Sequence, residues 1–139
     1  MEAGKFYHLA GASGVGKSTL LWTLARLHPL ISGTLQFKGK SHTKITVANW
    51  RAEIALLPQK AVIFTGTIAD NLLYPFHTFR IQKERLYKQN KLPPNFIKLQ
   101  QELDSVGLYD VSLERKASSL SGGQQARLAL IRLILTEQL

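Results

Sequence analysis

The chain has 139 residues, 45% of them hydrophobic, with 18 basic against 9 acidic side chains, a composition that indicates a globular domain and excludes a disordered chain. The absence of cysteine excludes disulfides and thiolate metal sites, and no apolar stretch approaches the roughly 20 residues that span a bilayer. The net charge of +9 leaves two partners open, nucleic acid or a polyanionic small ligand such as a nucleotide.

The N-terminal elements follow the order strand, turn, helix. Residues 6–10 are apolar and predict a short buried strand, and residues 11–16 form a glycine-rich turn. Leucines at helical spacing then predict a helix over residues 17–27. His28 and Pro29 end this helix, because proline cannot continue it.

The next part of the chain alternates short strands with a helical turn. Residues 33–39 lie between two glycines and predict a strand, and residues 45–47 predict a weaker one. A helical turn is expected over residues 50–53. The apolar run 54–57 predicts a further strand, which Pro58 stops.

From residue 67 to residue 118 the pattern is mostly helical. Thr67 is a candidate cap for a helix over residues 68–73, and residues 91–95 contain two prolines and interrupt the helical pattern. The chain therefore predicts an α/β part of residues 1–66, a helical subdomain of residues 67–118, and a last part of residues 119–139.

Two amphipathic helices are expected in the C-terminal half. The first covers residues 96–106, with Phe96, Leu99 and Leu103 on one face, and Gly107 closes it. The second follows Ser121-Gly122-Gly123 and runs from residue 124 to about residue 136.

The turn after the first predicted strand matches the phosphate-binding pattern G-x-x-x-x-G-K-[ST]. Glycines allow backbone N–H groups to point at phosphate oxygens, and the following helix presents its positive end to the same anion. Lys17 would neutralise the β- and γ-phosphates, and the Ser18 hydroxyl would ligate Mg²⁺. The candidate nucleotide-binding residues are Gly11, Ala12, Ser13, Gly14, Val15, Gly16, Lys17, Ser18 and Thr19.

A second motif, Leu120-Ser121-Gly122-Gly123-Gln124, lies over 100 residues later at the start of an apolar helix. With it the chain resembles the nucleotide-binding domains of ABC transporters, whose signature is LSGGQ. The resemblance covers the N-terminal two-thirds of such a domain. It implies an α/β fold of the P-loop NTPase class with a helical subdomain, left incomplete at the C-terminal end.

Segments between the two motifs agree with the family. Pro58-Gln59 is similar to its Q-loop, and residues 64–72 resemble the stretch that follows that loop. Residues 32–35 and 103–108 resemble the family's turn into its antiparallel strands and its helix end before the signature. Residues 125–127 depart mildly, since the family more often has two basic or amide residues before Arg127.

The resemblance implies the cofactors and the partners. ATP and Mg²⁺ would bind at the phosphate loop, with Ser18 and Gln59 as metal ligands and Gln59 accessory to catalysis. The signature loop would act in trans, closing over ATP held by a second ATPase domain in a head-to-tail dimer. A membrane-spanning permease would be the other partner, so the chain would lie in the cytoplasm on the inner face of the membrane.

ATP hydrolysis in this family needs an Asp and an adjacent Glu after an apolar strand that follows the signature helix. The chain contains no two adjacent acidic residues, and its four histidines all precede the signature. We therefore expect an ABC-type ATPase by family whose isolated 139-residue chain is inactive, with no residue present to activate water.

Two other functions remain open. One is a soluble ABC ATPase acting on nucleic acid or the ribosome, supported only by the basic charge, and no nucleic-acid-binding motif accompanies it. The other is a non-catalytic truncated fragment that binds phosphate. The spacing over residues 67–76 is similar to small bacterial ATPases linked to metal-ion export.

Overall fold

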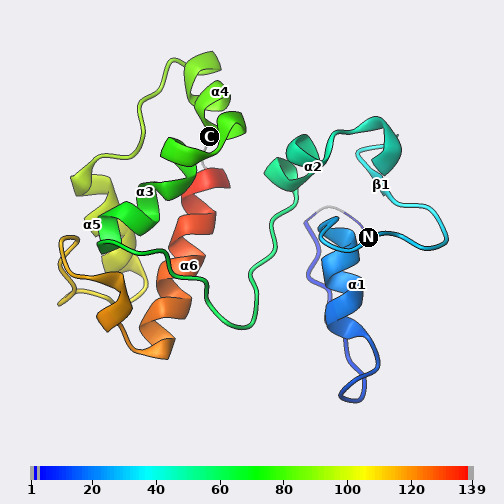
Figure 1. Ribbon diagram of the computed structural model, residues 1–139, viewed down its shortest axis with the longest axis horizontal. Coiled ribbons are helices and arrows are strands. Elements are labelled where there is room, and N and C mark those ends of the chain that lie inside the picture. The colour runs from blue at the N-terminus through cyan, green and yellow to red at the C-terminus, as the bar shows by residue number, and fades with distance from the viewer. Residues whose placement is uncertain (1, 3, 138–139) are drawn as a thin grey trace. The chain divides into compact units, whose positions relative to one another are not determined.

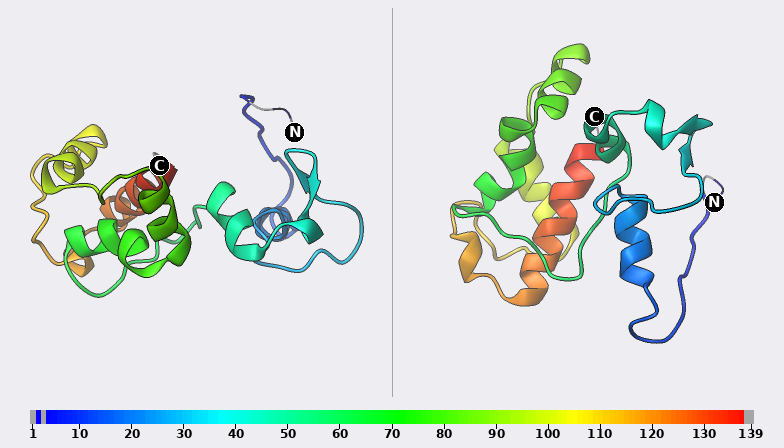
Figure 2. Two further views of the ribbon diagram at one scale, coloured as in Figure 1. Left: turned by 90° about the horizontal axis from the view of Figure 1, so that it is seen from above. Right: turned by 45° about the vertical axis from the view of Figure 1, so that its right-hand side comes forward.

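The computed structural model describes residue 2 and residues 4–137. Residues 1, 3, 138 and 139, which belong to the predicted parts 1–66 and 119–139, lie outside the described residues. The chain forms two compact units, residues 1–56 and residues 57–139, here named the N-terminal and C-terminal units. Figures 1 and 2 show the helices and strands of each unit.

The N-terminal unit contains two α-helices. Helix α1 spans Lys17–Leu24, so it ends three residues before the predicted boundary. Helix α2 spans Val47–Glu53, and its N-cap is Thr46, whose hydroxyl accepts a hydrogen bond from Asn49 N–H. This N-cap satisfies one of the free donors of the first helical turn.

A short β-hairpin separates the helices. Strand β1, Gln36–Phe37, pairs antiparallel with β2, Lys40–Ser41. Lys38 and Gly39 connect them and both have positive φ, of 49° and 73°, as a two-residue type I′ turn requires. A 3₁₀ helix, His42–Lys44, follows directly.

Trp50 forms the centre of the small N-terminal core. Its ring is buried, and its Nε1–H donates a 2.9 Å hydrogen bond to the carbonyl of Leu24 at the end of α1. Phe37 meets the ring edge-on at 5.9 Å, and the guanidinium of Arg26 lies 5.6 Å from its centroid. One indole therefore connects both helices to the hairpin.

Three predicted strands are absent from the part of the chain that the structure describes. Residues 6–10 and 54–57 have no regular structure. Ile45 and Thr46 lie between the 3₁₀ helix and α2, and Val47 is the first residue of α2. Of the strand predicted over residues 33–39, only Gln36–Phe37 forms. An apolar run becomes a strand only when a neighbouring strand pairs its N–H and C=O groups, and these segments have no such neighbour among the described residues.

The C-terminal unit is a helical bundle. Its helices are α3 (Ile68–Thr78), α4 (Arg80–Lys88), α5 (Phe96–Ser105) and α6 (Gly122–Glu137), with a 3₁₀ turn at Ala117–Ser119. Both α3 and α5 pack against α6, as the views in Figures 1 and 2 agree. The packed faces bury Ile68, Leu72, Leu99, Leu103, Leu128 and Ile131.

The predicted cap of α3 is confirmed, and the helix extends beyond residue 73. Thr67 and Asp70 form a capping box in which the Asp70 carboxylate accepts from Thr67 N–H at 2.7 Å. The N–H groups of Ile68 and Ala69 donate to the carbonyls of Arg115 and Leu113. The loop before the signature motif is thereby held against the start of α3.

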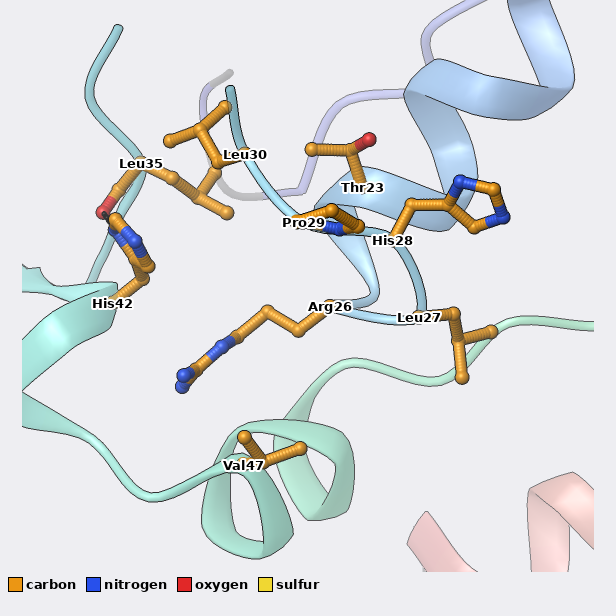
Figure 3. Close-up of a pocket in the computed structure, with 9 residues that line it drawn as sticks. All are labelled: Thr23, Arg26, Leu27, His28, Pro29, Leu30, Leu35, His42 and Val47. Carbon is orange, nitrogen blue, oxygen red and sulfur yellow. Dashed lines mark hydrogen bonds between the residues drawn. The ribbon is translucent and has the colours of Figure 1, made fainter. Parts of the chain in front are cut away.

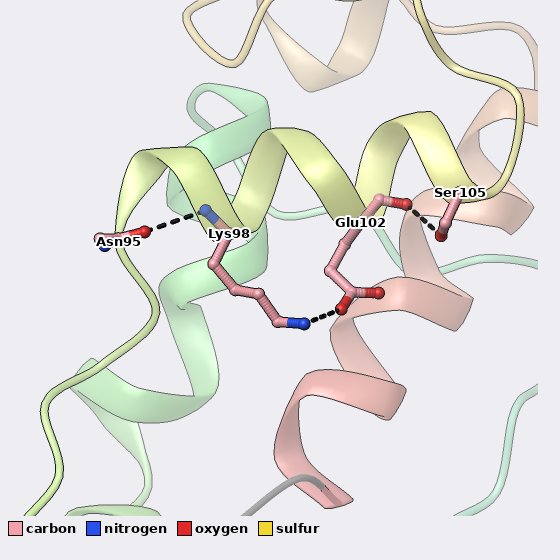
Figure 4. A network of polar contacts seen from close by, with 4 residues as sticks. All are labelled: Asn95, Lys98, Glu102 and Ser105. Carbon is pink, nitrogen blue, oxygen red and sulfur yellow. Dashed lines mark hydrogen bonds and ion pairs between the residues drawn. The ribbon is translucent and has the colours of Figure 1, made fainter.

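The predicted helix over residues 96–106 is confirmed as α5. Asn95 caps it, and a Lys98–Glu102 ion pair and a Ser105–Glu102 hydrogen bond follow along it (Figure 4). Leu99 and Leu103 are fully buried, but Phe96 is 58% exposed, so its assignment to the buried face is wrong. Phe96 is the first residue of the helix.

Gly107 ends α5 as expected, with a φ of 74° that favours glycine. The last helix, predicted from residue 124, begins two residues earlier.

The α/β architecture predicted for the fold is seen only in part. Within the described residues the sheet has two strands, and helices form most of the regular structure. In this same part of the chain, no helix has both the length and the apolar character needed to cross a membrane.

Candidate functional site

The phosphate loop lies at the N-terminus of α1 and is exposed to solvent. Three of its glycines, Gly11, Gly14 and Gly16, have φ values of 153°, 81° and 97°. Gly14 and Gly16 thus occupy the left-handed region that side chains rarely adopt. The sequence-predicted glycines are therefore the residues that allow the loop to turn into the helix.

The backbone N–H groups at the start of α1 have no side-chain acceptor at the cap position or in the first turn. Gly16 is the N-cap residue and provides no side-chain cap, and the first turn contains no acidic residue. The N–H groups of the first turn have no acceptor within the helix. Together with the positive end of the helix dipole, they make this terminus suited to an anion.

Lys17 places a positive charge in the same loop. Its ammonium donates hydrogen bonds of 2.7 Å to the carbonyl oxygens of both Gly11 and Ala12. The amine therefore lies across the loop rather than extending into solvent. Ser18 and Thr19 follow on the exposed first turn of α1.

Ser18 and Gln59, the predicted Mg²⁺ ligands, belong to different units. Gln59 is exposed in a bend after Pro58. Among the described residues, no three His, Cys, Asp or Glu side chains lie together in a group that could hold a metal ion. The pairing of Ser18 with Gln59 at one ion stays a prediction.

The signature motif forms the start of α6. Ser121 N–H donates to Gln124 Oε1 at 2.9 Å, and Gln124 N–H donates to Ser121 Oγ at 3.4 Å. This reciprocal pair is a capping box of the S-x-x-Q kind. Leu120 is buried beneath it, whereas Ser121, Gly122 and Gly123 are exposed.

Gly122 and Gly123 are not required by the fold of this chain. A methyl group at either position would meet nothing within 4 Å, and neither has a φ in the left-handed region. Glycine in a helix is about 1 kcal/mol less favourable than alanine. The exposed, smooth surface that they create at the helix N-terminus can accept a close neighbour.

Two residues that sequence reasoning did not assign hold the segment after Gln59 in place. Asn71 is fully buried; its Oδ1 accepts from Phe64 N–H at 2.8 Å and its Nδ2 donates to the carbonyls of Phe64 and Thr67. Arg132 donates to the carbonyl of Val62 at 2.6 Å and stacks over the Phe64 ring at 4.6 Å. Asn71 and Arg132 each interrupt the apolar pattern of their helix, α3 and α6. This interruption was the signal in the sequence that could have identified them.

Two charged groups of the C-terminal unit have shifted pKa values. Hydrogen bonds from the Thr67 backbone and hydroxyl lower the pKa of Asp70, because they stabilise its carboxylate. Partial burial lowers the pKa of Arg132, because desolvation disfavours the charged form. Arginine nevertheless stays protonated in proteins.

A separate cavity of about 330 Å³ lies within the N-terminal unit. Figure 3 shows its lining, which is mostly apolar and includes Leu27, Pro29, Leu30, Leu35 and Val47. The guanidinium of Arg26 already donates to the carbonyl of Ile45 at 2.6 Å. The His28 ring stacks on Trp22, and His42 Nδ1 lies 3.3 Å from the carbonyl oxygen of Leu35, so these lining side chains already have partners within the unit.

Comparison with known proteins places the two motifs in one family. A sequence profile described as ABC transporter matches residues 1–139. The "Probable iron export ATP-binding protein FetA" of Escherichia coli is 33% identical over 132 residues, which are 95% of this chain and 54% of that protein.

Two longer proteins are also similar. The "ABC-type transporter MDR1" of Aureobasidium melanogenum is 31% identical over 137 residues, 99% of this chain and 10% of that protein. The human "ATP-binding cassette sub-family B member 5" is 31% identical over 136 residues, 97% of this chain and 10% of that protein. The chain thus spans about half of FetA and about a tenth of the two longer proteins.

The match over the full 139 residues, together with the phosphate loop at α1 and the signature at α6, shows that the chain belongs to the ABC transporter family, whose ATPase domains have a P-loop NTPase fold.

Proposed function

We propose that the chain binds Mg-ATP at the phosphate loop as the ATP-binding part of an ABC transporter. The observation that carries this is the start of α1, where uncapped N–H groups and the Lys17 ammonium meet in one exposed loop. Phosphate oxygens would replace the carbonyls of Gly11 and Ala12 as acceptors for Lys17, and Ser18 would ligate the metal ion.

Titration calorimetry of the 139-residue chain with Mg-ATP tests this proposal. Replacing Lys17 by alanine should weaken binding about tenfold or more, because a charge-assisted hydrogen bond to phosphate is lost. Lys44→Ala is the matched control, since Lys44 is an exposed lysine of the same unit. Equal affinities for the two variants would contradict the proposal.

The signature loop would act in trans. Its bare glycines and the N-terminus of α6 form a second surface suited to an anion, in line with a head-to-tail dimer in which Ser121 faces ATP held by a second domain. A membrane-spanning permease would be the other partner, at the inner face of the membrane. The similarity to FetA supports export, with metal ions as the candidate cargo.

Hydrolysis by the 139-residue chain alone is not part of this proposal. The sequence contains no adjacent pair of acidic residues to hold Mg²⁺ and polarise water. We expect ATP binding without turnover, measured as phosphate release. Turnover that disappears in Lys17→Ala would show that another residue activates the water.

A further inference from the structure

A strongly basic segment covers residues 79–98, from the end of α3 through α4 and the following loop into α5 (Figure 1). It has six basic residues and one acidic residue, so its net charge is +5 in 20 residues, out of +9 for the chain. Its charged residues are Arg80, Lys83, Glu84, Arg85, Lys88, Lys91 and Lys98. No other stretch of the chain concentrates charge to this degree.

Three of these lysines have no acidic partner. Arg80 pairs with Glu84 at 2.7 Å, and Lys98 pairs with Glu102 at 2.7 Å. Lys83, Lys88 and Lys91 are exposed, and no carboxylate among the described residues lies within 4 Å of their amines. Their charge is therefore available to an external anion.

Large apolar side chains are exposed in the same segment. Tyr87 is 88% exposed, Leu92 87% and Ile97 70%. On α4, Arg80, Lys83 and Tyr87 share the outward face at i, i+3 and i+7, while Gln82 and Leu86 are buried on the opposite side. Cationic and apolar side chains are thus both exposed along this segment.

We propose that the basic segment contacts an anionic membrane surface. Lys83, Lys88 and Lys91 attract lipid headgroups, and Tyr87, Leu92 and Ile97 enter the boundary between headgroups and acyl chains. Aliphatic side chains favour a membrane over nucleic acid, where aromatic stacking and phosphate contacts provide the binding energy. That a membrane supplies the anionic groups rests on the function proposed above. The contact itself does not require ATP.

Sedimentation of the 139-residue chain with vesicles tests the contact. We expect binding to phosphatidylcholine vesicles that contain phosphatidylserine, little binding to phosphatidylcholine alone, and weakening by salt. The triple variant Lys83→Gln, Lys88→Gln, Lys91→Gln should lose about tenfold or more in partitioning. The matched control, Lys5→Gln, Lys40→Gln, Lys44→Gln, removes the same charge from exposed positions of the N-terminal unit and should keep most of the binding.

A second variant separates a membrane from other polyanions. Leu92→Ser, Ile97→Ser should weaken vesicle binding severalfold and leave binding to single-stranded RNA unchanged, because aliphatic side chains do not stack on bases. Circular dichroism of each variant verifies that the helices remain. Equal loss in both lysine variants, or RNA binding tighter than vesicle binding, would overturn the proposal. Such a failure leaves Mg-ATP affinity untouched, so it is distinguishable from failure of the nucleotide site.

Discussion

Arg132 donates a 2.6 Å hydrogen bond to the carbonyl oxygen of Val62, 70 residues earlier in the chain. The same guanidinium lies over the ring of Phe64, which stacks on Tyr74 at 3.8 Å between centroids. Arg132 belongs to α6, the helix that begins at the signature motif. The segment after Gln59 is therefore attached directly to the signature helix.

Arg132→Met should lower the free energy of unfolding by about 2 kcal/mol. The substitution removes a hydrogen bond from a charged donor, worth about 1.5–3 kcal/mol, together with the stacking on Phe64. Urea denaturation measures the change. Arg80→Met is the control, because the Arg80 side chain is 92% exposed and forms a surface ion pair with Glu84; it should change stability by less than about 0.5 kcal/mol. Similar losses in the two variants would contradict the role of Arg132.

Gly66→Ala should disrupt the start of α3. A methyl group there would lie 2.7 Å from Asp70 Oδ2, and the φ of 129° disfavours any side chain. The Asp70 carboxylate would have to leave Thr67, and we expect a loss of about 2 kcal/mol from the strain and the missing cap. Gly14→Ala provides a comparison, since its φ is also positive but nothing lies within 4 Å. A smaller loss of unfolding free energy for Gly66→Ala than for Gly14→Ala would contradict the predicted clash with Asp70.

Gly123→Ala should weaken the association of two copies of the chain without lowering the stability of the isolated chain. Among the described residues, nothing lies within 4 Å of the added methyl group, and alanine favours the helix by up to about 1 kcal/mol, so the isolated chain should be equally or more stable. Association of two copies in Mg-ATP, measured by sedimentation velocity, should weaken, because the methyl group stands where the second domain would approach. Unchanged association would count against a signature loop that acts in trans.

Acidification should remove the contribution of Asp70. Hydrogen bonds from Thr67 place the pKa of Asp70 below its ordinary value of 3.8 in the folded chain. A depressed folded pKa stabilises the protein above the unfolded value, and the contribution is lost as pH falls through the folded value. The difference in unfolding free energy between the wild type and Asp70→Asn should be constant well above pH 3.8 and shrink below pH 3.8. A difference that grows on acidification would refute the assignment.

Local signals predicted α3, α5 and α6 of the C-terminal unit, whereas α4 lies in a region that was predicted only as mostly helical. Thr67 with Asp70, and Asn95 before α5, are caps that need only a few neighbouring residues to act. The phosphate loop and the signature motif are equally local, because glycine conformations and helix starts are set within one turn of the chain. These features could therefore be derived from the order of the residues.

The strands and the support of the site could not be derived in this way. A strand at residues 6–10 or 54–57 depends on a partner elsewhere, and the apolar pattern does not specify one. Leu99 and Leu103 of α5 are buried as the helical spacing predicts, but its first residue, Phe96, is exposed, because helical spacing does not say which turns of a helix a neighbour covers.

By itself, the sequence determined which chemistry is predicted: which lysine would meet a phosphate, which hydroxyl would ligate Mg²⁺, and which glycines leave the helix ends open. Only the tertiary structure decided that Arg132 and Asn71 join the segment at Val62–Phe64 to the signature helix. The physical reason is that such contacts join groups up to 70 residues apart. Their formation depends on how α3 and α6 pack, which no local pattern encodes.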